Sequence, residues 1–292
     1  MFEQVDCNLC GSDKYEVIWD KEDRKKNGYL NSKIITIDGQ DCNMVNVQCL
    51  DCGLVYIRNR LTVEAMDKYY AEEYRNNYKL QHIPEAQHAF MAIKYISNIK
   101  GIKKSLDVGC GSGILVEQLS KNRIDAHGID LNDENFGYAN LEKVSLFNYN
   151  EKDFDLITIL NTLEHMHNPF AALARIRGML SDEGHLLVTV PNLYNNLLTT
   201  SADGFLSNAH LYTFDVQSIT NYMNICGFEI ERLSLAHEEN MQKIYLLVKK
   251  GDVRDINVLV KPEPEILHNM FRGIDFAFLS IYDFHKKLEV MN

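Results

Sequence analysis

Residues 106–113 read LDVGCGSG and stand between an apolar run and a helix-like segment that begins at Ile114. The glycines Gly109, Gly111 and Gly113 let the backbone turn tightly and approach a ligand closely, and the helix that follows offers unpaired N–H groups at its positive end. The order of strand, glycine loop and helix therefore predicts a binding site for a nucleotide-like cofactor. The match to a dinucleotide fingerprint is poor, because the sixth position from Gly109 is Ile114 instead of glycine or alanine.

Short β-rich runs alternate with helical segments around this loop. From residue 104 onward the runs SLDVG, DAHGID, FDLITIL and GHLLVTVPN are separated by GILVEQLSKN and PFAALARIRGML. This alternation predicts an α/β fold with a Rossmann-like, doubly wound and mostly parallel sheet, which the later runs FEIERLSL and KIYLLVKK can close as an antiparallel pair. Asp130 ends the second run, where a carboxylate can accept hydrogen bonds from both ribose hydroxyls.

Over roughly residues 84–250 the chain resembles the class I S-adenosylmethionine-dependent methyltransferases. The resemblance rests on LDVGCGSG, on GID at the second strand, and on FDLITILNTLEHMHNP leading into GHLLVTVPN. It implies that S-adenosylmethionine is the cofactor and that these residues surround it: Asp107, Gly109, Cys110, Gly111, Gly113, Asp130, Leu131, Asn148, Asn161, Thr162 and Leu163. In this interpretation Asp130 holds the ribose, Leu131 flanks the adenine, and Asn148 replaces an aspartate that many relatives carry in a longer loop.

An aromatic run, YYAEEYRNNY, covers residues 69–78. In relatives a tyrosine of such a lead-in helix reaches the carboxylate of the cofactor, so the resemblance also places Tyr78 in the cofactor site, with Tyr70 and Tyr74 as further candidates. Aromatic residues at helical spacing are more often part of a core, and this alternative stays open.

Three histidines stand where relatives place the methyl acceptor: His165 and His167 after the fourth strand, and His210 in AHLYTF. Methyl transfer mainly needs alignment of donor and acceptor, but a hydroxyl acceptor also needs a base. We therefore expect His210 or His165 to be catalytic, with Glu164 orienting a neighbour and Tyr194 as a candidate acceptor contact. The alternative for His165 is a residue that only shapes the pocket wall, and we expect His167 to face solvent.

Two Cys-x-x-Cys pairs lie in the first 60 residues, namely Cys7 with Cys10 and Cys49 with Cys52. Four thiolates close the tetrahedron of a structural zinc ion, and the glycine after each pair suits the tight knuckle turn. The pattern predicts a small zinc-ribbon-like module, with redox or unpaired cysteines as weaker alternatives. Joined to the methyltransferase pattern, it resembles bacterial methyltransferases that modify sugars in surface-polysaccharide or natural-product pathways.

Charge and composition exclude several kinds of partner. The formal net charge is −11, and residues 1–60 carry eight Lys and Arg against ten Asp and Glu, so we expect no nucleic-acid partner. No segment approaches the ~18 consecutive apolar residues of a membrane span. Because the start MFEQVDCNLC also lacks a signal-peptide pattern, we expect a cytoplasmic protein with no membrane span.

We expect four parts: a zinc-binding module (1–60), a helical lead-in or lid (61–100), the S-adenosylmethionine-binding domain (101–250) and a helical C-terminal extension (251–292) with an apolar face that allows a homodimer. The expected function is methylation of a small-molecule substrate, namely O-methylation of a sugar, nucleotide-sugar or glycan precursor. Three alternatives remain: carbon methylation of a keto-sugar nucleotide, a zinc-bearing ribosomal-RNA methyltransferase, and a non-catalytic module that only binds the cofactor.

Overall fold

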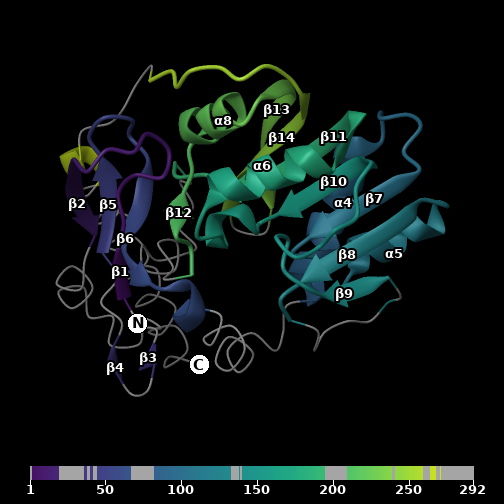
Figure 1. Ribbon diagram of the computed structural model, residues 1–292, viewed down its shortest axis with the longest axis horizontal. Helices are drawn as coiled ribbons and strands as arrows, with labels where there is room; N and C mark the ends of the chain where they lie inside the picture. Colours follow the sequence, from purple (N-terminus) through teal and green to yellow (C-terminus); the bar gives the residue numbers. More distant parts are fainter. Residues whose placement is uncertain are drawn as a thin grey trace, which may run out of the picture.

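In the computed structural model a large sheet and a small sheet lie side by side (Figure 1). The structure describes residues 2–19, 36–37, 40–41, 45–66, 82–132, 138, 140–194, 209–238, 241–258, 264–267 and 270. None of the helices in these ranges is long and apolar enough to cross a membrane. The division of the chain into four parts, with its three boundaries, stays a prediction.

The large sheet has the strand order β13-β14-β11-β10-β7-β8-β9. Its members are β7 (Lys104–Val108), β8 (Asp125–Asp130), β9 (Leu141–Lys143), β10 (Phe154–Leu160), β11 (Leu180–Pro191), β13 (Phe228–Glu238) and β14 (Met241–Lys250). The five neighbouring strands β11, β10, β7, β8 and β9 run parallel to one another. The strand β14 is antiparallel to both of its neighbours, β11 and β13. This confirms the predicted Rossmann-like α/β fold and its closing antiparallel pair.

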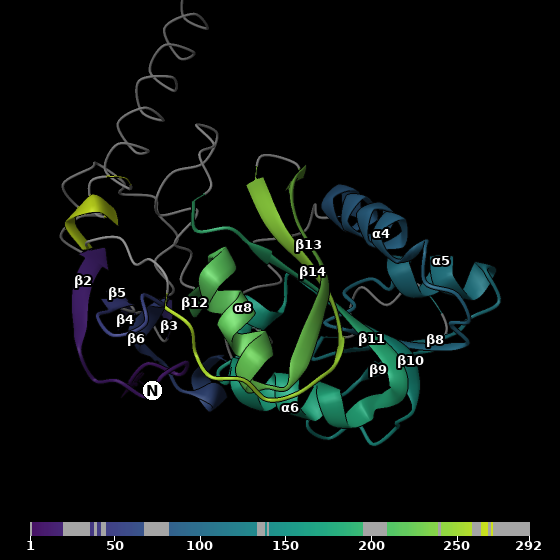
Figure 2. The same ribbon diagram turned by 90° about the horizontal axis from the view of Figure 1, so that it is seen from above.

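Helices cover both faces of this sheet (Figure 2). On one face lie α4 (His82–Ile96) and α5 (Ile114–Lys121), and on the other lie α6 (Pro169–Met179) and α8 (Val216–Ile225). The strands are apolar on both sides for this reason: Leu156 packs with the cluster under α4 and α5, whereas its neighbour Ile157 packs with the cluster under α6 and α8.

The small sheet has the order β1-β6-β5-β2, with β12 added at β6. Its strands are β1 (Phe2–Gln4), β2 (Tyr15–Trp19), β5 (Val45–Cys49), β6 (Val55–Leu61) and β12 (Tyr212–Thr213), and a separate pair consists of β3 (Thr36–Ile37) and β4 (Gln40–Asp41). The strand β12 comes from the segment between β11 and α8, and it places Tyr212 opposite Tyr56. The N-terminal module is therefore joined to the main domain through a shared sheet.

The sequence just after β12 determines where the helix α8 begins. The helix α8 begins after Asp215, whose side chain accepts a hydrogen bond from the Ser218 backbone N–H at 2.7 Å, while the Ser218 hydroxyl oxygen accepts one from the Asp215 N–H at 3.0 Å. This reciprocal capping box stabilises the start of the helix. His210 lies two residues before β12, so the paired strand and the capped helix both follow it directly in the chain.

Candidate active site

The glycine loop connects β7 to α5, and all three of its glycines adopt a left-handed backbone: φ is 75° at Gly109, 54° at Gly111 and 84° at Gly113. A Cβ at Gly109 would collide with the Thr162 side chain, and one at Gly111 would lie 2.9 Å from Oε1 of Glu85. The loop therefore passes closer to its neighbours than a side chain would allow, and it lies directly beside the end of β10.

Asp130, at the end of β8, is fixed against this loop. Its Oδ2 accepts a hydrogen bond from the Gly111 N–H at 3.0 Å, and its Oδ1 accepts one from the Asn132 N–H at 2.9 Å. Burial raises the pKa of Asp130, and these two bonds work against that shift. Leu131 beside it keeps 53% of its surface exposed. A carboxylate and an apolar side chain thus stand together at the open edge of the loop.

Asp107 lies beneath the loop, at the end of β7. Its carboxylate accepts a hydrogen bond from the Thr158 hydroxyl at 2.6 Å, which ties β7 to β10. Burial raises the pKa of Asp107 to about 7, and the negative charges of Asp130 and Glu85 add to this effect. Cys110 is buried in the same loop, and burial also raises the pKa of its thiol. This cysteine therefore acts as a small packed residue.

Glu85 on α4 is a site residue that the sequence did not reveal. Its Oε2 accepts a hydrogen bond from the Ser112 hydroxyl, so α4 is attached to the glycine loop by its first turn. The spacing predicts a helix here, but nothing in it marks this glutamate. Together with Asp107 and Asp130, Glu85 surrounds one loop with three carboxylates, an arrangement that favours a positively charged ligand.

The end of β10 carries a second polar group, formed by Asn161, His88 and Lys243. Asn161 has a left-handed backbone with φ of 48°, a conformation that asparagine tolerates better than most residues. Its amide nitrogen lies 3.4 Å from Nδ1 of His88, whose Nε2 contacts the Lys243 ammonium. Burial lowers the pKa of His88 to about 3, and the charge of Lys243 adds to the shift. His88 is therefore neutral near neutral pH.

The short helix η1 (Leu163–His165) follows β10 and carries the predicted acceptor residues. The His165 Nδ1–H donates to the Ala209 carbonyl at 2.8 Å, and the rings of His165 and His210 meet edge to face with centroids 4.8 Å apart. Burial lowers the pKa of His165 to about 4, so this ring is neutral near pH 7. Two histidines that are far apart in the sequence thus form one pair just after the carboxyl end of β10.

Glu164 points into the same corner and is almost fully buried, with 1% of its surface exposed. Within the described part of the chain, neither of its carboxylate oxygens has a hydrogen-bond partner. Its Oε1 lies 4.0 Å from Nε2 of His165. Burial raises the pKa of Glu164 to about 8.

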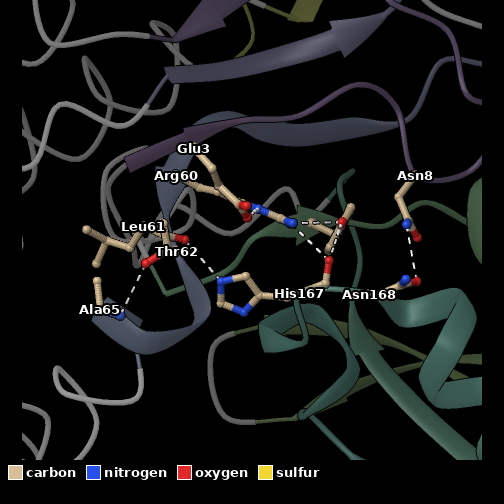
Figure 3. A network of polar contacts seen from close by, with 9 residues as sticks. Glu3, Asn8, Arg60, Leu61, Thr62, Ala65, His167 and Asn168 are labelled. Carbon is tan, nitrogen blue, oxygen red and sulfur yellow. Dashed lines mark hydrogen bonds and ion pairs between the residues drawn. The ribbon is translucent and has the colours of Figure 1, made fainter. Parts of the chain in front are cut away.

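The prediction that His167 faces solvent is wrong. Its Nε2–H donates to the Leu61 carbonyl at 3.0 Å, and its own carbonyl accepts bonds of 3.0 Å from both the Arg60 guanidinium and the Tyr212 hydroxyl (Figure 3). Arg60 is held in turn by Glu3 at 2.7 Å. The reason is the position of β6, which lies against the loop after η1 and forms hydrogen bonds with both the ring and the carbonyl of His167.

Asn8, inside the first cysteine knuckle, makes a second contact between the N-terminal module and the main domain. Its amide donates to Oδ1 of Asn168 at 3.2 Å (Figure 3), and its own oxygen accepts from the Tyr222 hydroxyl at 3.1 Å. Asn168 caps the start of α6 by accepting from the Ala171 N–H at 3.0 Å. The knuckle therefore contacts the segment that follows His167.

The four cysteine sulfurs gather as their spacing predicts. The Sγ atoms of Cys7 and Cys52 are 3.5 Å apart, as are those of Cys10 and Cys49, and all four lie within 4.8 Å of one another. In each pair the following glycine donates its N–H to the carbonyl of the first cysteine, at 2.8 and 2.9 Å. Four thiols in this arrangement fit a tetrahedral zinc site.

A family model described as a methyltransferase domain matches residues 70–233, which is more than half of the chain. The chain belongs to this methyltransferase domain family. The predicted family resemblance is thereby confirmed.

Curated relatives of this chain include two ubiquinone biosynthesis O-methyltransferases. The protein from Aliivibrio fischeri is 30% identical over 113 residues, which cover 33% of this chain and 48% of that protein. The protein from Aeromonas salmonicida is 23% identical over 185 residues, which cover 55% of this chain and 77% of that protein. The chain spans about half the length of the first curated relatives that it matches.

A solved structure with the same fold is the 1,6-didemethyltoxoflavin-N1-methyltransferase of Burkholderia thailandensis, which was crystallised with 1,6-didemethyltoxoflavin and S-adenosylhomocysteine. It is 13% identical, with a TM-score of 0.54, and the match covers 70% of this chain and 97% of that one. The likeness confirms the Rossmann-like fold of the methyltransferase domain.

The remaining predicted site residues of the methyltransferase lie in different surroundings. Leu163 is fully buried and packs in the core cluster shared with α6 and α8. Asn148 is exposed in the turn after β9, and Tyr194 is partly exposed after β11. Tyr70, Tyr74 and Tyr78 lie outside the described residues. The cofactor and acceptor roles of all these residues stay predictions.

Proposed function

We propose that this chain is an S-adenosylmethionine-dependent methyltransferase that acts on an oxygen atom of a small molecule. The observation that carries the proposal is the ring of three carboxylates, Asp107, Asp130 and Glu85, around the glycine loop. Near pH 7 Asp107 is only partly ionised, so it is mainly the charges of Asp130 and Glu85 that repel the phosphates of a dinucleotide and attract the sulfonium and ammonium groups of S-adenosylmethionine. When bound, this cofactor supplies a methyl group that is already activated for transfer.

Each part of the loop has a role in holding that cofactor. Asp130 would accept hydrogen bonds from the ribose hydroxyls, and exposed Leu131 would cover the adenine. The N–H groups at the start of α5 and the side chains of Asn161 and Thr162 would line the pocket next to the methyl donor. Glu85 would complete the pocket from α4 with a negative charge.

The His165 and His210 pair would remove the proton of the acceptor. Because the Nδ1–H of His165 is engaged by the Ala209 carbonyl, its Nε2 carries the lone pair that can accept a proton. Burial lowers the pKa of His165, so the ring is neutral near pH 7 and able to accept a proton. The O-methyltransferase names of the curated relatives support oxygen as the methylated atom.

The acceptor that we propose is a sugar, a nucleotide-sugar or a glycan precursor, and the four-cysteine module supports this class by its resemblance to sugar-modifying methyltransferases. We also propose that the four thiols hold a structural zinc ion. The zinc would fix the knuckle that carries Asn8, and β6 would hold the loop after η1 through Arg60 and Leu61. The module would thereby position the segment that carries His165.

The proposal is tested by incubating the protein with S-adenosylmethionine and a panel of sugars and nucleotide-sugars while S-adenosylhomocysteine release is measured. We expect release that depends on one acceptor, with a mass gain of one methylene and an O-attached methyl signal in NMR. A methyl group attached to carbon or nitrogen would contradict oxygen transfer. No binding of S-adenosylhomocysteine in calorimetry would contradict the methyltransferase assignment itself.

A further inference from the structure

We propose that Glu164, His165 and His210 form a binding site for a divalent transition-metal ion, separate from the four cysteines. This inference rests on the proposed function, because the ion would act on the acceptor of that reaction. Each of the three residues offers one ligand atom, and the three atoms lie within 4.8 Å of one another. One carboxylate and two imidazoles are a donor set that zinc and other transition metals bind in catalytic sites.

Glu164 gives independent support. Its side chain is almost completely buried, and neither carboxylate oxygen has a hydrogen-bond partner in the described part of the chain. A buried, unpartnered carboxylate is costly, so such a group calls for a ligand. The charge of Lys243 lowers the pKa of Glu164, but no hydrogen bond joins the two side chains. A cation between Glu164 and the histidines would supply the missing partner.

His165 is oriented as metal-binding histidines usually are. Its Nδ1–H donates to the Ala209 carbonyl at 2.8 Å, which leaves the lone pair on Nε2. A backbone carbonyl behind the ring fixes the tautomer and orientation of many metal ligands. The same Nε2 lies 4.0 Å from Oε1 of Glu164. Since Ala209 directly precedes His210, one bond sets the positions of both histidines relative to Glu164.

The site requires a small closure. Bonds of about 2.0–2.2 Å place tetrahedral ligand atoms roughly 3.5 Å apart, so the most distant pair must approach by about 1 Å. Three protein ligands leave one position, which the acceptor hydroxyl can take. There the hydroxyl loses its proton to solvent more readily, so in the metal-bound protein the ion replaces His165, whose Nε2 is then a ligand, as the means of deprotonation. The hydroxyl oxygen then forms the bond to the methyl group as the sulfur–methyl bond breaks, and S-adenosylhomocysteine leaves.

The test is a titration of the zinc-loaded protein with Co²⁺, followed by visible spectroscopy and metal analysis. Cobalt at nitrogen and oxygen ligands gives weak d–d bands without the thiolate charge-transfer absorption that the cysteine site would produce. We expect one Co²⁺ per chain in addition to zinc, with bands of this kind. Glu164→Gln and His210→Ala should each weaken the binding at least tenfold, and Glu183→Gln, a change at an exposed glutamate, should leave it unchanged.

Two outcomes would overturn the inference: no d–d bands in the wild-type protein, or equal Co²⁺ affinity in Glu164→Gln. Titration of each variant with S-adenosylhomocysteine shows whether it is folded and separates this inference from the proposed function. Protein that binds S-adenosylhomocysteine but no Co²⁺ refutes only the metal site. Protein that binds Co²⁺ but no S-adenosylhomocysteine supports the metal site and refutes the methyltransferase proposal.

Discussion

The four cysteines and the Glu164, His165 and His210 cluster are two groups of proposed metal ligands with opposite character. The cysteines supply four identical soft donors within a module that holds them by knuckle turns. The second cluster supplies three mixed donors at the strand-end edge of the large sheet, where His165 keeps 24% of its side-chain surface exposed. A closed set of four donors stabilises a fold, whereas three donors leave a coordination position at which a ligand can bind.

The largest effect is expected from Cys52→Ser, which removes one of the four proposed zinc ligands. Structural zinc contributes on the order of 10 kcal/mol to the folding of small zinc modules, so we expect loss of the zinc and of the module's structure. Turnover should fall more than a hundredfold, while affinity for S-adenosylhomocysteine stays within about threefold. Metal analysis and calorimetry check this. Cys226→Ser, a change at a buried thiol outside the cluster, is the control, and full turnover without zinc would refute the positioning role.

His210→Ala tests the cluster of Glu164, His165 and His210. A positioned acid–base group contributes about 10²–10⁴-fold, so turnover should drop by about a hundredfold with nearly unchanged cofactor affinity. Steady-state kinetics with the identified acceptor measure the effect. His185→Ala is the matched control, because His185 pairs with Glu231 on the sheet, away from this corner. A near-normal rate would exclude His210 from the chemistry.

Arg60→Met tests the connection between the two clusters. Arg60 donates to the His167 carbonyl and to Tyr212, and its loss should loosen the segment that carries His165. We expect turnover to fall about tenfold, which corresponds to about 1.4 kcal/mol and is close to the lower end of what a hydrogen bond to a charged group contributes. Arg58→Met on the same strand removes a hydrogen bond to Gln4 and a contact with the Tyr15 ring, both within the small sheet, and should leave turnover unchanged. Equal rates for the two variants would mean that the clusters are independent.

Asp107→Asn tests whether a change beneath the glycine loop leaves both clusters unaffected. Burial raises the pKa of Asp107 to about 7, above its unfolded value near 4, so the folded state retains a proton that the unfolded state loses. Stability should therefore fall as pH rises from about 4 to about 7, by at most about 1.4 kcal/mol per pH unit. Denaturant unfolding at pH 5 and pH 7 should show a smaller pH dependence in Asp107→Asn, with zinc content unchanged.

The features that the sequence predicted are those whose signal is local. The glycine loop, Asp130 after the second strand and the Cys-x-x-Cys pairs are each encoded within a few residues, because backbone turns and knuckles impose fixed spacings. The alternation of apolar runs likewise predicted the sheet and its antiparallel closure. These elements required no knowledge of which segments meet in space.

The features that were missed depend on distant contacts. Glu85 and Lys243 reach the site from α4 and β14, and neither stands in a pattern that differs from an ordinary surface residue. The two-residue strand β12 is too short to be recognised from its composition, yet it joins the small sheet. The error at His167 has the same origin, since its partners Leu61 and Arg60 come from β6.

The central claim is tested most directly by calorimetric titration of the wild-type protein and Asp130→Ala with S-adenosylhomocysteine. Asp130 connects β8 to the glycine loop and is the proposed ribose ligand. We predict one S-adenosylhomocysteine bound per chain, with affinity at least tenfold weaker in Asp130→Ala. No binding by the wild-type protein, or equal affinity in the two proteins, would contradict the account.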